Sequence, residues 1–152
     1  MMASQQAISS AAPALQALQA VVSAIKNEGA VSDRNCRLLY FLAQEALIGA
    51  SEILDNKQVK RIEATSSGRS FFLVASSSRK PHLSIPGFCS CAAFRHKVAS
   101  RAELLVCKHE LAVMLAEALG MSVKEQIDDE QWAQRFSLAW ALQTCDYGET
   151  TS

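Results

Sequence analysis

The sequence predicts an α+β domain with a helical N-terminal part, a small antiparallel sheet of about three strands, and C-terminal helices. The hydrophobic period changes from helical to alternating near residue 57, and it becomes helical again after Cys107. The chain has 152 residues, 49% apolar and 20% charged, which is enough to bury one core. We therefore expect one compact domain with three regions, at residues 1–56, 57–120 and 121–152.

The first region is expected to form two helices. Apolar residues at helical spacing predict the first helix, with Pro13 in its opening turn and Gly29 at its end. Ser32 suits the N-cap of a second helix, which should run from about Asp33 to Leu54. Apolar residues surround much of this second helix, so it should be buried on more than one side, in its own core or against a partner chain.

The middle region has the pattern of short strands. Runs of β-branched and aromatic residues on either side of Gly68 predict a hairpin, with strands at about Val59–Thr65 and Arg69–Ser76. The stretch "HLSIPGF" predicts a third strand that leads directly into Cys89. Pro86 indicates that this strand either lies at the edge of the sheet or ends at the proline, because proline has no amide proton to donate to a neighbouring strand.

The last two helices follow Cys107. A helical apolar face predicts the first of them, and Gly120 is a suitable end for it. After a polar link, the acidic run Asp128–Glu130 suits the electropositive start of the final helix, in residues 121–152. That helix carries an aromatic residue at every fourth position, which is typical of core packing; the three are Trp132, Phe136 and Trp140.

Basic residues are concentrated in the middle of the chain. Between Lys57 and His109 there are ten basic and two acidic residues. The remainder of the chain has an equal excess of acidic over basic residues, so the total net charge is zero. Such a region faces nucleic acid phosphates, an acidic protein partner, or only solvent, and charge alone does not decide between them. The candidate contact residues are Arg69, Arg79, Lys80, Arg95, Lys97 and Arg101.

No membrane span and no signal peptide are expected in this sequence. No apolar run approaches the length of a transmembrane helix, and the N-terminal residues lack a basic segment followed by an apolar one. The chain therefore has the pattern of an intracellular protein, in which clustered cysteine and histidine indicate metal or catalysis before disulfides.

Four residues have the spacing of a metal site: Cys89, Cys91, Cys107 and His109, in the pattern C-x-C-x15-C-x-H. Zinc prefers four such ligands in a tetrahedron, and soft thiolates with one imidazole suit it better than magnesium or calcium. The second pair should lie at the opening turn of a helix, where the positive end of the helix dipole favours thiolate. Four protein ligands leave no position for a catalytic water, so the pattern indicates a structural zinc ion.

Other chemistries fit the cysteines less well. A C-x-C disulfide would be strained, the redox motif C-x-x-C is absent, and a Cys107–His109 nucleophilic pair would lack an orienting group and an oxyanion hole. No P-loop motif occurs, so the chain is not expected to be an ATPase. The residues expected to lie outside the metal site are His82, His96, Cys36 and Cys145.

The stretches "SSGRSFFLVASSS", "CSCAAF" and "CKHELAVML" together resemble a known family. The four-ligand pattern is similar to the SWIM zinc finger, which many proteins share. The flanking "SGR", the serine-rich loop and the small size narrow the resemblance to the SWIM-domain subunit of the Shu complex, also called SWIM-type zinc finger protein seven or Sws-one. The resemblance covers about Gln58–Gly120, together with the length and the leading helices.

The resemblance implies an adaptor rather than an enzyme. In that family the four ligands hold one structural Zn²⁺, which carries over onto the four residues named above. The family is nuclear and acts in homologous recombination and DNA repair, including meiosis. It pairs with a RecA-family recombinase paralogue, which has the nucleotide-binding fold, and supports the recombinase filament on single-stranded DNA.

Direct DNA contact by the chain itself is expected to be weak. Aromatic residues that could stack on bases are few in the middle region, and most of them are expected in the core. The alternative is a stand-alone nucleic-acid-binding SWIM module, such as a transcription factor or a transposon-derived factor. That alternative predicts tight, salt-dependent DNA binding by the isolated chain.

Overall fold

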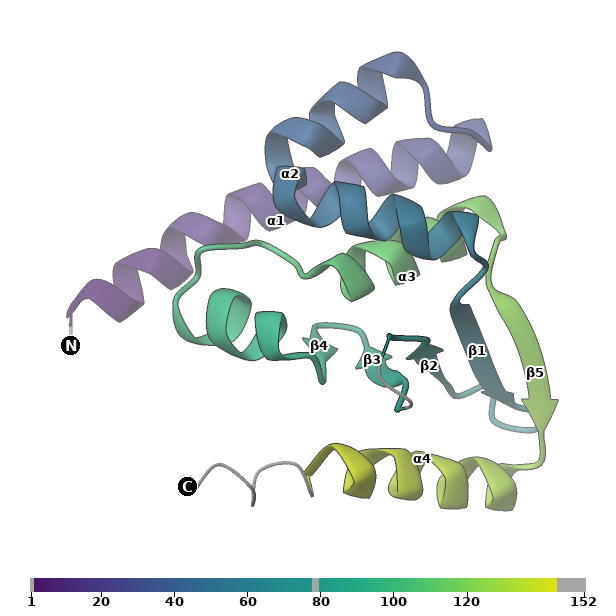
Figure 1. The fold of residues 1–152 in the computed structure, drawn as a ribbon. Coiled ribbons are helices and arrows are strands. Elements are labelled where there is room, and N and C mark those ends of the chain that lie inside the picture. The colour runs from purple at the N-terminus through teal and green to yellow at the C-terminus, as the bar shows by residue number, and fades with distance from the viewer. Residues whose placement is uncertain (1, 78–79, 145–152) are drawn as a thin grey trace.

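A mixed sheet of five strands lies between two layers of helices, as the computed structural model of the chain shows for residues 2–77 and 80–144 (Figure 1). The strand order is β4-β3-β2-β1-β5. Helices α1, α2 and α3 lie on one side of the sheet, and α4 lies on the other. The expected α+β class is confirmed, with a helical N-terminal part and C-terminal helices. Arg79 and Cys145 lie outside the described residues.

The two N-terminal helices are α1 (Met2–Glu28) and α2 (Asp33–Asp55). Pro13 lies inside α1, so the expectation that it opens the helix is wrong. Ser32 caps α2 as expected, because its hydroxyl accepts a hydrogen bond from the amide of Asn35 at 3.2 Å. Ala43 interrupts the α2 helix with φ −144° and ψ 42°, a bend that the hydrophobic pattern did not indicate.

The predicted hairpin is present as β1 (Val59–Ala64) and β2 (Ser70–Val74), which pair antiparallel. Gly68 has φ +71° in the turn between them, a conformation that glycine adopts without steric cost. Strand β3 (His82–Ile85) pairs with β2 on one side and with β4 (Phe88–Cys89) on the other. Pro86 therefore follows the end of β3 and does not mark an edge strand.

Strand β5 (Val123–Ile127) corrects the predicted sheet in two ways. It lies in the segment expected to be a polar link, and it pairs in parallel with β1, so the sheet is mixed. The predicted third strand is also two strands, β3 and β4, so the sheet has five strands in all. Glu125 of β5 lies 2.7 Å from Lys60 of β1, and an ion pair therefore supports the strand pairing. A strand with three consecutive polar residues, Lys124, Glu125 and Gln126, fits this position because β5 is at the edge of the sheet.

Helix α3 (Lys108–Leu119) lies between the sheet and the first two helices (Figure 1). It ends at Gly120 as predicted. Its buried face, together with α1, α2, β1 and β2, forms a mostly aliphatic core. The helices approach closely at Gly49 of α2, where an added Cβ would lie 2.6 Å from Cδ of Lys108. Helix α2 therefore packs closely against the first turn of α3 at Gly49.

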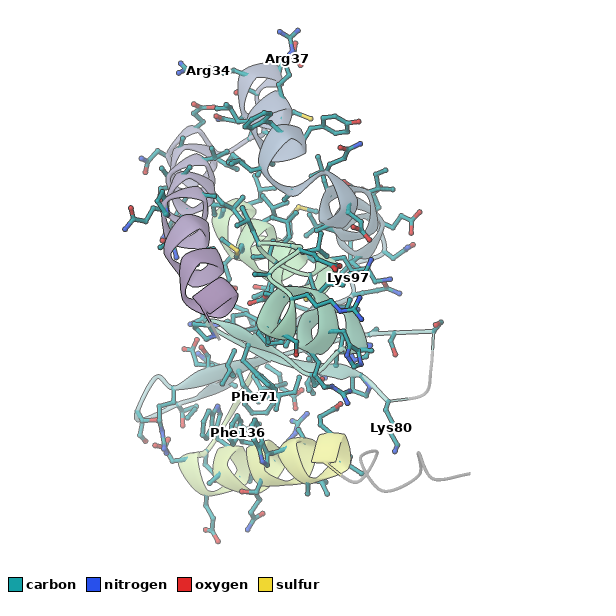
Figure 2. The ribbon with its side chains drawn as sticks, turned by 90° about the vertical axis from the view of Figure 1, so that its left-hand side faces the viewer. Arg34, Arg37, Phe71, Lys80, Lys97 and Phe136 are labelled. Carbon is teal, nitrogen blue, oxygen red and sulfur yellow. The ribbon has the colours of Figure 1, made fainter. Side chains whose placement is uncertain are left out.

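Helix α4 (Asp129–Thr144) covers the opposite face of the sheet with aromatic rings. Figure 2 shows Phe71 of β2 facing Phe136 of α4, and their ring centroids are 5.4 Å apart. Trp132 packs on both rings and donates a hydrogen bond from Nε1 to the carbonyl oxygen of Ile62 at 3.2 Å. Core packing is confirmed for these residues, whereas Trp140 remains 44% exposed.

The segment between the two halves of the cysteine cluster is not an extended loop. It contains the π-helix η1 (Phe94–Ser100), whose end is fixed by a hydrogen bond from the amide of Arg101 to the carbonyl oxygen of His96. Lys97 of this helix lies 2.6 Å from Glu45 of α2, so the segment is attached to the helical layer. Among the helices in the described part of the chain, none is long and apolar enough to cross a membrane.

Candidate metal centre

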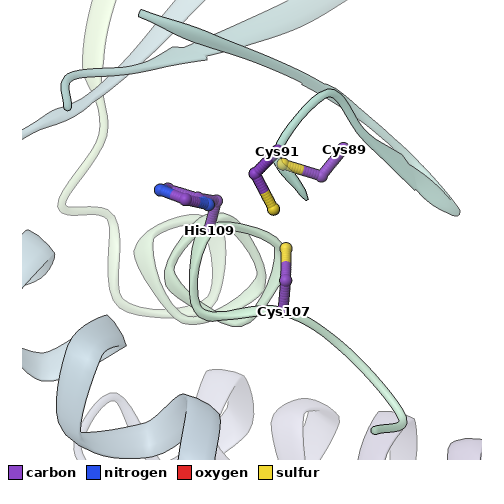
Figure 3. Close-up of side chains that lie close together, drawn as sticks. All are labelled: Cys89, Cys91, Cys107 and His109. Carbon is purple, nitrogen blue, oxygen red and sulfur yellow. The ribbon is translucent and has the colours of Figure 1, made fainter. Parts of the chain in front are cut away.

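The four predicted ligands come together, although two of them lie more than fifteen residues from the others in sequence (Figure 3). The ligand atoms of Cys89, Cys91, Cys107 and His109 all lie within 4.8 Å of one another. The exposed fractions of the four residues are 1%, 4%, 1% and 5%. Cys89 belongs to β4, Cys91 follows it, and the other two residues begin α3.

The first pair is held by the turn that follows β4. Cys89 pairs with Ser84 of β3, and the next residue continues the contact, since the amide of Leu83 donates to the hydroxyl of Ser90 at 2.9 Å. The chain then bends, and the Sγ atom of Cys91 accepts a hydrogen bond from the amide of Phe94 at 3.2 Å. The bend therefore allows two cysteines that lie two residues apart to face the same point.

The second pair is held by the N-terminus of α3. Cys107 is the N-cap, and its Sγ atom accepts a hydrogen bond from the amide of Glu110 at 3.4 Å. The carboxylate of Glu110 accepts one from the amide of Cys107 at 3.4 Å, which completes a capping box with cysteine in the place of serine or threonine. Burial raises the pKa of Glu110 to about 7. Glu110 was not among the predicted site residues, although C-x-x-E has the spacing of a capping box.

The three thiols strongly affect one another. Hydrogen bonds with Cys107 and Cys89 lower the pKa of Cys91 far below its usual range. The corresponding hydrogen bonds with Cys107 and Cys91, together with burial, raise the pKa of Cys89. One of the three cysteines is therefore stabilised as a thiolate. A second or third thiolate in the same cluster would need a cation beside it, because like charges repel. A divalent metal ion supplies that charge.

His109 offers a nitrogen that no protein group uses. Its Nδ1 atom is buried and has no hydrogen-bond partner, which is costly unless the atom has another ligand. A metal ion would satisfy it, so the residues present fit a bound metal. His82, expected to be an ordinary strand residue, lies against this imidazole with a ring centroid distance of 4.3 Å. Burial, followed by the nearby His109, lowers the pKa of His82.

The arrangement suits a closed metal site and not a disulfide. Among the described residues the cysteines are all free, and the three in the cluster are buried, whereas Cys36 lies exposed on α2. Three sulfurs and one nitrogen at this separation are the donor set that zinc prefers. His96 is exposed on η1 and does not belong to the cluster, in agreement with the prediction.

The basic residues do not form one continuous patch. Arg69 lies over the ring of Trp132, near the start of α4, with its guanidinium carbon 4.7 Å from the ring centroid. Lys80 lies close to the other end of α4, beside Gln143. Lys97 is paired with Glu45, and Arg101 lies 3.7 Å from Glu103. Contact of these residues with nucleic acid stays a prediction.

A buried cluster of three cysteines and one histidine, formed by the end of a strand and the N-terminus of a helix, is the donor set typical of small zinc-finger proteins. The chain is 32% identical to zinc finger SWIM domain-containing protein 7 of Danio rerio over 126 residues, which are 82% of this chain and 87% of the relative. The chain therefore belongs to the family of zinc finger SWIM domain-containing protein 7.

More distant relatives carry the same name. The human protein is 27% identical over 116 residues, covering 75% of this chain and 82% of the relative. A homolog from Dictyostelium discoideum is 21% identical over 104 residues, which are 67% of each chain. No family model matches the chain. No solved structure matches it either.

Proposed function

We propose that the chain is a zinc-stabilised adaptor subunit of a Shu-type complex in the nucleus, and that it promotes homologous recombination. In this proposal a RecA-family recombinase paralogue is its partner, and the pair supports assembly of the recombinase filament on single-stranded DNA. The chain itself is not an enzyme. The single observation that carries the proposal is the buried Cys/His cluster in a chain similar to SWIM domain-containing protein 7.

The donor set of the cluster supports a structural role for the metal. Cys89, Cys91, Cys107 and His109 would hold one Zn²⁺ with four protein atoms, which leaves no open position for substrate or water. The ion would link the end of the sheet to the start of α3, because the two pairs of ligands come from these elements. Its free energy of binding would therefore contribute to folding, and function would depend on the surfaces that the fold presents.

Exposed apolar side chains on α2 support the adaptor role. Phe41 is 84% exposed and Ile48 is 66% exposed, and Leu38 is partly exposed on the same helix. Large apolar side chains that stay in solvent on one helix are typical of a protein-binding surface. The bend at Ala43 lies between Phe41 and Ile48, so the surface follows a helix that changes direction.

Co-expression with the RecA-family paralogues of the source organism tests the proposal. With zinc in the medium, the tagged chain should co-purify with one of them in a fixed ratio. Phe41→Glu should abolish this capture while zinc content stays unchanged. Leu138→Glu is the matched control, since Leu138 is also an exposed apolar residue but lies on α4. Failure of the wild-type chain to capture any such paralogue would refute the adaptor role.

A reactive thiol would favour an enzyme over an adaptor. The proposal expects a thiol-alkylating reagent to leave Cys107 unmodified in the zinc-loaded chain, because a buried zinc thiolate is protected. Cys36 is exposed and should react at once, which provides an internal control. Rapid modification of Cys107 before zinc is chelated would contradict the non-catalytic assignment.

A further inference from the structure

His82 packs its ring against the imidazole of His109, one of the four candidate metal ligands. The ring centroids lie 4.3 Å apart and the ring planes are inclined by 52°, so the contact is a tilted one between two flat side chains. The two residues come from different elements, since His82 begins β3 and His109 lies in the first turn of α3. The contact therefore joins the sheet to the helix at the edge of the metal cluster.

The plane of a histidine ring is not fixed by its own torsion angles. Rotation about the bond to the ring is broad, because this bond joins an sp³ carbon to an sp² carbon, so an imidazole needs an outside contact to keep one orientation. In most metal sites that contact is a hydrogen bond from the second ring nitrogen to a carboxylate, a carbonyl or a water. In the part of the chain that the structure describes, no carboxylate, carbonyl or hydroxyl group is hydrogen-bonded to the ring of His109.

Open space lies on two sides of the contact between the two rings. Hollows of about 350 Å³ and about 310 Å³ border His109, and His82 lines both of them. The second hollow also borders Cys91 and Cys107, so it reaches the cluster itself. Lys108 lines both hollows as well, but its exposed, flexible side chain cannot set the plane of a ring. The ring of His82 is thus the rigid group beside the imidazole.

The sheet fixes the position of His82. Its backbone pairs with Val74 of β2, and the next residue, Leu83, is fully buried. Strand β3 also holds the first half of the cluster, because Ser84 pairs with Cys89 of β4. One strand therefore determines where a cysteine ligand lies and where the neighbour of the histidine ligand lies.

We propose that His82 is a positioning residue of the metal centre, and that its ring holds the imidazole of His109 in the orientation needed to bind the metal. His82 is not itself a ligand, since the four ligand atoms are complete without it. Because it acts through ring contact, another flat ring at position 82 should serve as well, and a small side chain should not. This inference rests on the zinc ion of the proposed function but not on the proposed partner.

The zinc affinity of the full-length chain, measured by competition with a chromophoric chelator, tests the inference. His82→Ala should weaken zinc binding by about tenfold to a hundredfold, the usual effect of losing an outer partner of a metal-binding histidine. His82→Phe keeps a flat ring, for which the adjoining hollows leave room, and should bind zinc as the wild type does. His96→Ala, at an exposed histidine outside the cluster, is the matched control and should change nothing.

X-ray absorption at saturating zinc separates positioning from a general loss of structure. His82→Ala should keep three sulfur neighbours around the metal, while the nitrogen neighbour becomes disordered or is replaced by water, because the histidine alone has lost its support. Circular dichroism at the same zinc concentration should match the wild type. Loss or disorder of the sulfur neighbours as well would show that His82 supports the whole cluster and not the ring, which would overturn the proposal.

The affinities of the variants decide the remaining possibilities. Equal losses in His82→Ala and His82→Phe would also overturn the proposal, because a ring nitrogen and not the ring contact would then be required. If the wild-type chain bound no zinc at all, the proposed zinc-stabilised adaptor would fail together with this inference. Zinc binding by the wild type that His82→Ala leaves unchanged would refute this inference alone.

Discussion

On its α3 side the sheet packs against mostly aliphatic side chains and ends at the buried Cys/His cluster, whereas on its α4 side it packs against aromatic rings. The residues of the cluster are buried, whereas the aromatic residues of α4 become more exposed along the helix, from Trp132 at 9% to Trp140 at 44%. Both sides therefore contribute a buried core, but the core on the α4 side continues into an aromatic ring that stays in solvent.

Removal of a cluster residue should have the largest effect. We expect Cys107→Ser or His109→Ala to abolish zinc binding and to unfold residues 88–115, since zinc contributes on the order of 10 kcal/mol in zinc-finger peptides. Metal analysis and hydrogen exchange measure the two effects. Cys36→Ser is the matched control, because Cys36 lies exposed on α2. Equal metal loss in the control would refute the ligand assignment.

Truncation of the aromatic core should have the next largest effect and leave the metal in place. Phe71 is fully buried against Trp132 and Phe136, so Phe71→Ala should cost about 3–5 kcal/mol in the free energy of unfolding. Urea denaturation measures it. Phe41→Ala, at an exposed position on α2, should change stability by less than about 0.5 kcal/mol. Zinc loss in folded Phe71→Ala would mean that the two sides are not independent.

A smaller loss of stability is expected from overpacking between α2 and α3. Gly49→Ala places a Cβ about 2.6 Å from Cδ of Lys108, which lies between two candidate ligands. Overpacking should outweigh the gain in helix propensity, for a net loss of about 1 kcal/mol in stability. The same substitution in a Lys108→Ala background should cost less, because most of the crowding atoms are gone. An equal cost in both backgrounds would show that this contact is not responsible.

Removal of the ion pairs made by the edge strand β5 should have the smallest effect on the free energy of unfolding. Glu125 of β5 lies 2.7 Å from Lys60 and 2.5 Å from Arg135, which lower the pKa of its carboxyl group below the usual 4.5. Glu125→Gln should cost less than about 1 kcal/mol, since such exposed pairs are screened by solvent.

The pH dependence of that contribution follows from the lowered pKa. The contribution should be fully present above pH 4.5 and should be lost as the pH falls through the folded-state pKa. Urea denaturation at several pH values measures it, with exposed Glu130→Gln as the control. A contribution that instead disappeared as the pH rose above 4.5 would contradict the predicted sign.

Sequence reasoning succeeded where the signal was local. Spacing predicted that Cys89, Cys91, Cys107 and His109 lie together, and the hairpin and the end of α3 followed from glycines and hydrophobic period. The capping box of Cys107 and Glu110 was missed, although its signal was local too, because cysteine was not considered as an N-cap.

Other errors concern contacts between distant parts of the chain. Strand β5 pairs in parallel with β1, and its short polar sequence becomes a strand only beside that partner. His82 lies against His109 because β3 brings it there, and no local pattern indicates this contact. The π-helix η1 lies in a basic segment whose apolar residues pack against the cysteines, a context that the sequence does not reveal.

X-ray absorption at the zinc edge of the purified chain tests the central claim most directly. We predict one zinc ion per chain, with three sulfur atoms at about 2.3 Å and one nitrogen at about 2.0 Å. This result would establish a closed site made from the four residues of the cluster. A water oxygen in the coordination shell, fewer than three sulfurs, or no zinc in the folded protein would contradict the account.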